Sequence, residues 1–182
     1  MRRRTLLGLA GPALLAGCGF QLRRAPDFAF TSITINARPS SPLAEELRRA
    51  ILAAEDVTVL AGGTPAATVP AAPATGGPVV AMPQPGAVVL DIPMEQREKV
   101  VVGLNATGQV REFQLRTRVR IRLRTAAGAE LIPETELLQQ RDMSFSEPQA
   151  LAKEQEESLL YREMQAELVQ QLMRRLAAVR AV

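Results

Sequence analysis

The sequence predicts an α+β fold in which two amphipathic helices pack on one face of a largely antiparallel or mixed sheet. Three observations support this prediction. One segment alternates arginine with residues that suit a buried face, two segments carry apolar residues every three or four positions, and the elements follow in the order β-α-β, loop, β-β-β-α. A sheet with one apolar face must bury that face against other elements. We therefore expect both helices on the same face.

The composition narrows the possible classes of protein. The chain has 182 residues, of which 47% are hydrophobic and 23% are charged. These values fit one ordinary globular domain and exclude a polytopic membrane protein. The sequence contains no His, which excludes catalytic sets that need His and metal sites with His ligands. It contains a single Cys, which excludes an internal disulfide and a metal site made of several Cys residues. We expect neither a metal ion nor a cofactor.

The start of the chain has the layout of an export signal. Arg2–Arg4 precede the apolar stretch Leu6–Ala16, which is shorter than the roughly 20 residues that a membrane span needs. The following Leu15–Cys18 resembles the lipobox of bacterial lipoproteins, in which cleavage before the Cys accompanies the attachment of acyl chains such as palmitate. The resemblance implies that residues 1–17 are a signal peptide and that Cys18 is a lipid anchor. An uncleaved anchor with a chance Cys is the alternative.

Further details of the same region bear on location and charge. In enterobacterial lipoproteins an Asp after the anchor cysteine signals retention in the inner membrane, so by resemblance Gly19 favours the outer membrane. Arg3 and Arg4 also resemble a twin-arginine signal, which leaves two export routes open. Without residues 1–17 the chain carries 19 basic and 19 acidic residues. A neutral mature chain does not favour nucleic acid as a partner.

The first elements of the predicted domain are a strand, a helix and a short strand. Thr31–Asn36 alternates in polarity and predicts a half-buried strand. Ser41 and Pro42 are a favourable N-cap and first helical residue. The apolar positions of this helix are Leu43, Leu47, Ile51 and Ala54. Val57–Leu60 is a brief apolar run that predicts a second strand.

Residues 61–87 differ from the rest of the chain. They contain eight Ala, six Pro and five Gly and carry no charge. Such a segment has little apolar surface to bury, and its prolines cannot donate hydrogen bonds to a sheet. We expect a flexible insertion within a single domain that spans residues 18–182; a Pro-rich docking segment is the alternative.

Beyond the insertion, the pattern predicts more strands and one long helix. The expected elements are strand pieces at Val88–Ile92 and Val100–Leu104 around a polar patch at Glu95–Lys99, a turn at Asn105–Gly108, a strand at Val110–Thr125 and a return strand at Leu131–Met143. Ser146 and Gln149 have the spacing of a capping box, so a helix should follow toward Ala178. Its apolar stripe is Leu160, Met164, Leu168, Leu172, Leu176 and Val179. This stripe indicates packing on the sheet, with a coiled coil as the alternative.

The most regular segment is Leu115–Arg124, in which every second residue is arginine. The two-residue period of a strand places these arginines on one face and Leu, Thr, Val and Ile on the other. We call the five arginines the arginine row: Arg116, Arg118, Arg120, Arg122 and Arg124. One interpretation is a solvated face that Glu134, Glu136 and Asp142 of the return strand neutralise.

The other interpretation of the arginine row is a cationic track for a polyanion. Guanidinium groups bind phosphate well, often through two parallel hydrogen bonds. Nucleic acid is disfavoured because no aromatic residues alternate with the arginines to stack on bases. A phosphorylated lipid suits an exported lipoprotein better.

Four segments, in order along the chain, together resemble one known family. They are Ala16–Arg23, where the lipobox is followed by Gly-Phe-Gln-Leu-Arg; Ser41–Leu43; Asn105–Leu115; and Pro148–Glu154, which runs into Leu172–Leu176. They resemble the lipopolysaccharide-assembly lipoproteins of the LptE family, from which the insertion at residues 61–87 departs. The resemblance implies two helices against a four-stranded sheet.

The resemblance also implies a function. Such a chain is expected to be a non-enzymatic lipoprotein of the outer membrane that is held by its acyl chains and faces the periplasm. It would plug the lumen of the barrel protein LptD, assist the assembly of that barrel and bind lipopolysaccharide during its insertion into the outer leaflet.

The family resemblance assigns one candidate residue directly. Lys153 matches a family lysine implicated in lipopolysaccharide binding, whereas the turn at Leu104–Thr107 lacks the family's second basic residue. Arg111 is a substitute by proximity. The remaining candidates for lipopolysaccharide contact are Arg116, Arg118, Arg120 and Arg122. The alternative for Lys153 is a solvated lysine that pairs with Glu156 or Glu157.

Two other functions stay open at this point. The first is a structural envelope lipoprotein whose arginine face is only solvated. The second is an envelope hydrolase that uses a pair of carboxylates. Its candidate residues, obtained by elimination, are Glu95, Glu98, Glu134 and Glu136.

Overall fold

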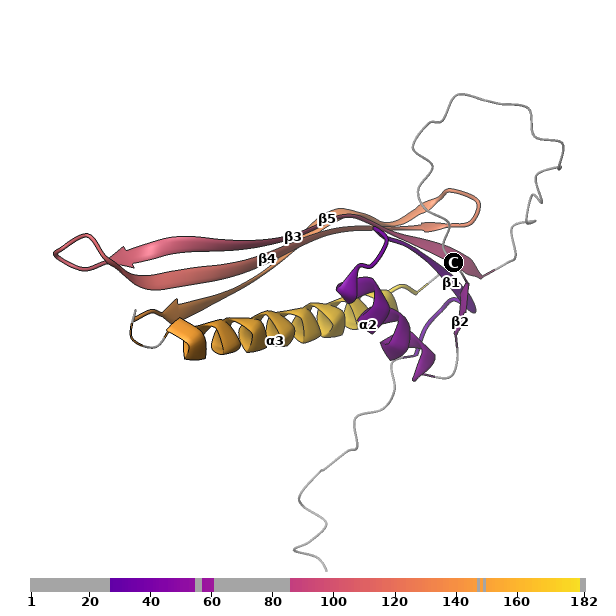
Figure 1. Ribbon diagram of the computed structural model, residues 1–182. Coiled ribbons are helices and arrows are strands. Elements are labelled where there is room, and N and C mark those ends of the chain that lie inside the picture. Colours follow the sequence, from indigo (N-terminus) through magenta and orange to yellow (C-terminus); the bar gives the residue numbers. More distant parts are fainter. Residues whose placement is uncertain (1–26, 55–56, 61–85, 147, 149, 181–182) are drawn as a thin grey trace, which may run out of the picture.

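The computed structural model shows an elongated sheet with both helices on one of its faces (Figure 1). It describes residues 27–54, 57–60, 86–146, 148 and 150–180. The signal peptide, the anchor at Cys18 and all but the last two residues of the 61–87 insertion lie outside the described residues. Those three expectations therefore stay predictions.

The described elements alternate between strands and helices before ending in one long helix. In chain order they are β1 (Ser32–Asn36), α2 (Pro42–Leu52), β2 (Thr58–Leu60), β3 (Ala87–Leu104), β4 (Val110–Thr125), β5 (Glu130–Ser144) and α3 (Ala150–Ala177). The sheet has the strand order β2-β1-β3-β4-β5. β1 runs parallel to β2 and to β3, and the other neighbours are antiparallel. Neither described helix is both long and apolar enough to cross a membrane.

The α+β class with two helices and a mixed sheet is confirmed, but the count of four strands is wrong. The described sheet has five strands. The additional strand is the three-residue β2, which pairs with β1 from Ser32 to Thr34. The apolar run at 57–60 did predict this strand, whereas the count of four came from the family resemblance. β2 forms because α2 returns the chain to the free edge of β1, where a parallel neighbour needs such a crossover.

A second correction concerns β3, which is one strand of 18 residues rather than two pieces around a polar patch. The polar residues continue the strand because β4 pairs with them along its length. A register shift between Asp91 and Met94 moves the odd-numbered residues onto the helix-facing side. Arg97 and Lys99 consequently reach α3, where they contact Gln165 and Glu157 at 2.6 Å each.

The start of α2 follows the predicted capping chemistry. The Ser41 hydroxyl accepts a hydrogen bond from the Ala44 N–H at 3.1 Å, and Pro42 occupies the first helical position. Leu43, Leu47 and Ile51 are almost fully buried against the sheet. Their burial is what stabilises so short a helix, because isolated helices of this length are marginal in water.

The main core lies between the sheet and both helices, near the end where β1 and β2 lie (Figure 1). The predicted stripe of α3 is confirmed at its centre, where Met164, Leu168, Leu172 and Leu176 are fully buried. Toward the start of α3 the packing thins to a small cluster of Leu115, Met143 and Met164. The capping box cannot be compared, because Gln149 lies outside the described residues.

The predicted turn closes the long β3–β4 hairpin. The Asn105 Oδ1 atom accepts hydrogen bonds from the backbone N–H groups of Thr107 and Gln109 at 3.0 and 2.8 Å. Gly108 has a φ of 80°, which glycine adopts without a steric penalty. This hairpin turn projects beyond the start of α3 (Figure 1).

Candidate functional site

The arginine row lies on the open face of the sheet, as its alternation predicted. Val119, Ile121 and Leu123 of β4 have no exposed surface, and they face the helices. The arginines alternate with these residues along β4 and therefore lie on the opposite side, where no described element covers the sheet (Figure 1). A register slip by one residue would bury the guanidinium groups, so the pattern of β4 fixes the register.

The arginine row is neutralised by carboxylates on both neighbouring strands. Arg120 lies 3.7 Å from Glu134 and 3.5 Å from Glu136, both on β5. Arg118 lies 3.7 Å from Glu98 on β3. The first interpretation of the row correctly predicted Glu134 and Glu136 as partners. Asp142 instead accepts a hydrogen bond from Gln114, and the Arg116 Nε–H donates to that same glutamine.

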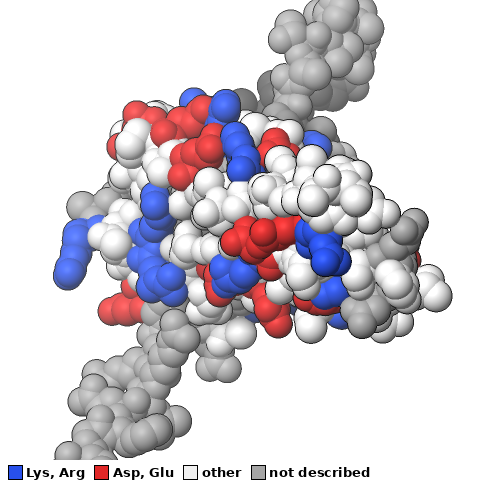
Figure 2. Space-filling view, turned by 90° about the vertical axis from the view of Figure 1, so that its left-hand side faces the viewer, with Lys and Arg blue, Asp and Glu red and all other residues white. Residues whose placement is uncertain are grey.

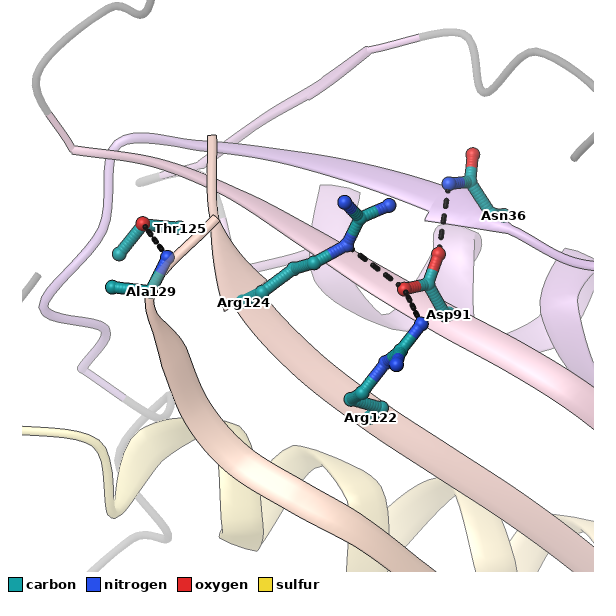
Figure 3. A network of polar contacts seen from close by, with 6 residues as sticks. All are labelled: Asn36, Asp91, Arg122, Arg124, Thr125 and Ala129. Carbon is teal, nitrogen blue, oxygen red and sulfur yellow. Dashed lines mark hydrogen bonds and ion pairs between the residues drawn. The ribbon is translucent and has the colours of Figure 1, made fainter. Parts of the chain in front are cut away.

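Asp91 binds two members of the row at once (Figure 3). Its carboxylate accepts hydrogen bonds from Arg124 at 3.0 Å, from Arg122 at 3.3 Å and from Asn36 at 2.9 Å. Burial by itself would raise the pKa of Asp91. The hydrogen bonds from Asn36 and Arg124, together with the positive charge of Arg124, outweigh burial and hold the pKa below its ordinary value of 3.8.

Sequence reasoning missed Asp91 and Glu98 as partners of the row. One signal was available, because Asp91 interrupts the apolar run Val88–Ile92, and a carboxylate in such a run needs a partner. The sequence does not predict which residue that partner is, since this depends on the β3–β4 register. The consequence is a row in which four of the five guanidinium groups have a carboxylate within 4 Å.

Lys153 is also occupied by neighbours. Its ammonium group donates hydrogen bonds to the Ser144 hydroxyl at 3.1 Å and to Glu156 at 2.7 Å. The side chain is only 15% exposed. The predicted pairing with Glu156 is therefore present, while Glu157 is bound by Lys99 at 2.6 Å.

Arg111 differs from the row and from Lys153. It is exposed, and its side chain makes no hydrogen bond or ion pair with any described residue. Its backbone carbonyl accepts a hydrogen bond from the Phe145 N–H at 2.8 Å. A cleft of about 380 Å³ lies beside it, lined by Gln109, Val110, Arg111, Phe145, Ser146 and Pro148.

The structure brings Arg111 and Lys153 to the same end of β5. Arg111 is bound through its backbone to Phe145, and Lys153 through its side chain to Ser144, the residue before it. The row lies farther along β4, with Arg116 opposite Gln140 and Arg120 opposite Glu136. Figure 2 shows the molecule from the hairpin-turn end, where Lys and Arg alternate with Asp and Glu instead of forming one cationic area.

The four carboxylates considered for a hydrolase do not converge on one site. Glu95 pairs in register with the buried Val119, and Glu98 with the outward Arg116, so the two lie on opposite faces of β3. Glu134 and Glu136 both bind Arg120. Within the described ranges, no group of three or more Asp, Glu, His or Cys residues is arranged to hold a metal ion.

Comparisons with known proteins agree with this fold. The lipopolysaccharide-assembly family LptE matches residues 29–176. The solution structure of lipoprotein B from Nitrosomonas europaea is 30% identical, with a TM-score of 0.67, and the match covers 88% of this chain and 91% of that one. No curated protein sequence matches the chain.

Two further solved structures share the fold at lower identity. Rare lipoprotein B from Shewanella oneidensis is 17% identical with a TM-score of 0.60, over 81% of this chain and 95% of that one. A minor lipoprotein from Acinetobacter baumannii is 16% identical with a TM-score of 0.58, over 84% and 94% of the two chains. Because the family match spans most of the described elements, the chain belongs to the LptE family of non-enzymatic lipopolysaccharide-assembly lipoproteins of the cell envelope.

Proposed function

We propose that the protein is an outer-membrane lipoprotein that plugs the LptD barrel, assists its assembly and binds lipopolysaccharide during insertion into the outer leaflet. Family membership supports the assembly role. The lipobox supports removal of residues 1–17 and acylation of Cys18, which leaves residues 18–182 as one periplasm-facing domain. More than one acyl chain is needed for stable membrane binding, and lipoproteins of this type carry three.

We propose that lipopolysaccharide phosphates bind first at Arg111 and Lys153. The observation that supports this most directly is the exposed Arg111, whose side chain has no partner among the described residues, beside a cleft at the strand end that also holds Lys153. A free guanidinium group can bind a phosphate without first losing a protein partner. Lys153 must exchange Glu156 for the phosphate, so we expect it to contribute less than Arg111.

The proposal keeps Arg116, Arg118, Arg120 and Arg122 as secondary contacts. A phosphate at Arg118, Arg120 or Arg122 must displace a carboxylate that is already within 4 Å. Among the described residues, the Arg116 side chain has only the amide oxygen of Gln114 as a partner. Of the row residues, Arg116 is therefore expected to contribute most to lipopolysaccharide binding.

The test uses the mature acylated protein and purified lipopolysaccharide. Arg111→Gln is expected to weaken binding about tenfold, which corresponds to roughly 1.4 kcal/mol. Arg162→Gln is the matched control, because Arg162 is also an exposed arginine without a described partner but lies on α3. Equal affinity of the Arg111→Gln protein and the unmodified protein would remove Arg111 from the site.

A structural envelope lipoprotein is the second candidate function, and the neutralised arginine row favours it. The two candidates differ in whether a barrel partner exists. Mild-detergent purification of the tagged mature protein should recover a large β-barrel protein if the plug proposal is right. Recovery of the lipoprotein alone, together with unchanged lipopolysaccharide export after gene deletion, would favour the structural role.

A further inference from the structure

The last part of α3 carries arginines that no described residue neutralises. Beyond Glu167 the chain contains Arg174, Arg175 and Arg180 and no Asp or Glu. All three arginines are exposed, and none of their side chains makes a hydrogen bond or ion pair with another described residue. Glu167 itself is bound by Arg141 at 2.5 Å. This segment therefore presents three positive charges that have no partner among the described residues.

Helix electrostatics explain only part of this arrangement. Cations in the last turn of a helix interact favourably with its exposed carbonyl ends, which accounts for Arg174 and Arg175. Arg180 lies beyond the end of α3 at Ala177. The arginine row is different again, because carboxylates neutralise its charges on the sheet. Neither helix electrostatics nor a carboxylate among the described residues therefore accounts for all three charges at the end of α3.

The three arginines lie at the end of the molecule where the chain enters the fold. The end of α3 and the start of β1 lie at one end of the molecule, and the hairpin turn lies at the other (Figure 1). Phe28 and Val179 both pack against the main core cluster at that end. The chain therefore enters the fold at the same end as the three arginines.

The length of chain before the fold sets how far this end can lie from a lipid anchor. Asp27, the first described residue, follows Cys18 by nine positions, which span at most about 32 Å when fully extended. The 18 residues of β3 alone extend over roughly 60 Å. An anchored Cys18 thus keeps the arginine end close to the bilayer, while the hairpin turn can point away from it.

We propose that Arg174, Arg175 and Arg180 form a membrane-contact surface for anionic phospholipid headgroups in the leaflet that holds the anchor. The phosphodiester of a lipid such as phosphatidylglycerol offers the planar oxygen pair that a guanidinium group binds in a forked geometry. A negatively charged leaflet attracts basic residues within about a Debye length of its surface. The inference rests on the proposed acylation of Cys18, and it orients the long axis of the protein with the hairpin turn farthest from the headgroups.

The test measures how close the end of α3 lies to lipid headgroups. Cys18 is the only cysteine in the sequence, so in the acylated mature protein Ala178→Cys supplies the one thiol that a fluorophore can label. Ala178 is exposed and separates Arg175 from Arg180. The labelled protein is reconstituted into vesicles that contain headgroup-nitroxide lipid, made of phosphatidylcholine alone or with added phosphatidylglycerol.

We expect quenching of the label to be about twofold stronger with phosphatidylglycerol and to weaken as salt is raised. Replacing Arg174, Arg175 and Arg180 by Gln should return quenching to the level seen in phosphatidylcholine. Arg162→Gln, which lies nearer the start of the same helix, should leave quenching unchanged. A label at Ala106→Cys in the hairpin turn should stay unquenched in both lipids.

Flotation of the vesicles separates this inference from the proposed function. If the protein floats but quenching is independent of phosphatidylglycerol, or survives the triple Arg→Gln change, the membrane-contact surface is overturned and the anchor stands. If the protein does not float in either lipid, the anchor at Cys18 is overturned and the membrane contact with it. Quenching of the Ala106 label would overturn the proposed orientation.

Discussion

The arginine row differs from Arg111 and from the arginines at the end of α3 in what surrounds its side chains. Four of the five arginines in the row have a carboxylate of β3 or β5 within 4 Å. Arg111 and the arginines at the end of α3 have no described partner. The most regular charged pattern in the sequence is therefore the most thoroughly neutralised one. Charge regularity indicates strand register, whereas availability for a ligand depends on what the neighbouring strands contribute.

The largest expected effect is a difference in stability between substitutions on the two faces of β4. Ile121 is fully buried, and truncation to Ala removes packed atoms from the main core. We expect Ile121→Ala to lower the free energy of unfolding by about 2–5 kcal/mol. The adjacent Arg120 has a side chain that is 47% exposed, so Arg120→Ala should cost under about 1 kcal/mol. Urea unfolding of both variants measures the difference, and similar losses would contradict the assignment of the two faces.

The second test compares a free arginine with a paired one in ligand binding. Arg111→Gln should weaken lipopolysaccharide binding about tenfold, whereas Arg120→Gln should change it by less than about threefold because Glu134 and Glu136 already occupy that guanidinium group. The measurement is a titration of the folded variants with lipopolysaccharide. A larger loss at Arg120 would reverse the order of the two sites and return the row to first place.

A third test removes the carboxylate that holds two members of the row. Asp91→Asn keeps the shape of the side chain but removes its charge, so the hydrogen bonds from Arg122 and Arg124 weaken. We expect a loss of about 1 kcal/mol in the free energy of unfolding, reduced from the usual value for charged hydrogen bonds because both arginines are partly solvated. Asp142→Asn is the control, since the one described side chain that donates to the Asp142 carboxylate is the neutral Gln114.

The smallest expected effect is a dependence of stability on pH. Folding lowers the pKa of Asp91, so its contribution is present above the unfolded-state pKa of about 3.9 and is lost as pH falls through the lower folded-state pKa. Stability should therefore fall as the pH drops below about 4, and this fall should be shallower in Asp91→Asn. Unfolding titrations at several pH values provide the measurement; identical acid profiles would show that Asp91 does not contribute.

Several elements were predictable because their causes are local. The bounds of β4 match the predicted strand. Its strict alternation allows only one of its two faces to be buried. The start of α2 followed from Ser41 and Pro42, whose capping role needs only their own backbone neighbourhood. The apolar stripe of α3 was readable from its period, and the α+β class followed from the order of the elements.

For the candidate site, the sequence predicted the basic residues but only part of their surroundings. It predicted Glu134 and Glu136 as partners of the row because the return strand shares the alternation of β4. It did not predict Asp91 or Glu98. It offered Arg111 only by proximity in sequence, and the fold then brought Arg111 to the strand end that holds Lys153.

By itself, the sequence determined most of the elements, the apolar and polar faces of β4 and the family to which the chain belongs. Only the tertiary structure decided that Asp91 and Glu98 pair with the row, because that pairing depends on the β3–β4 register and on the bulge after Asp91. That bulge turns Arg97 and Lys99 toward α3 and leaves Glu98 facing the row. A one-residue shift exchanges the two faces of a strand, and residues far apart in the chain fix that shift.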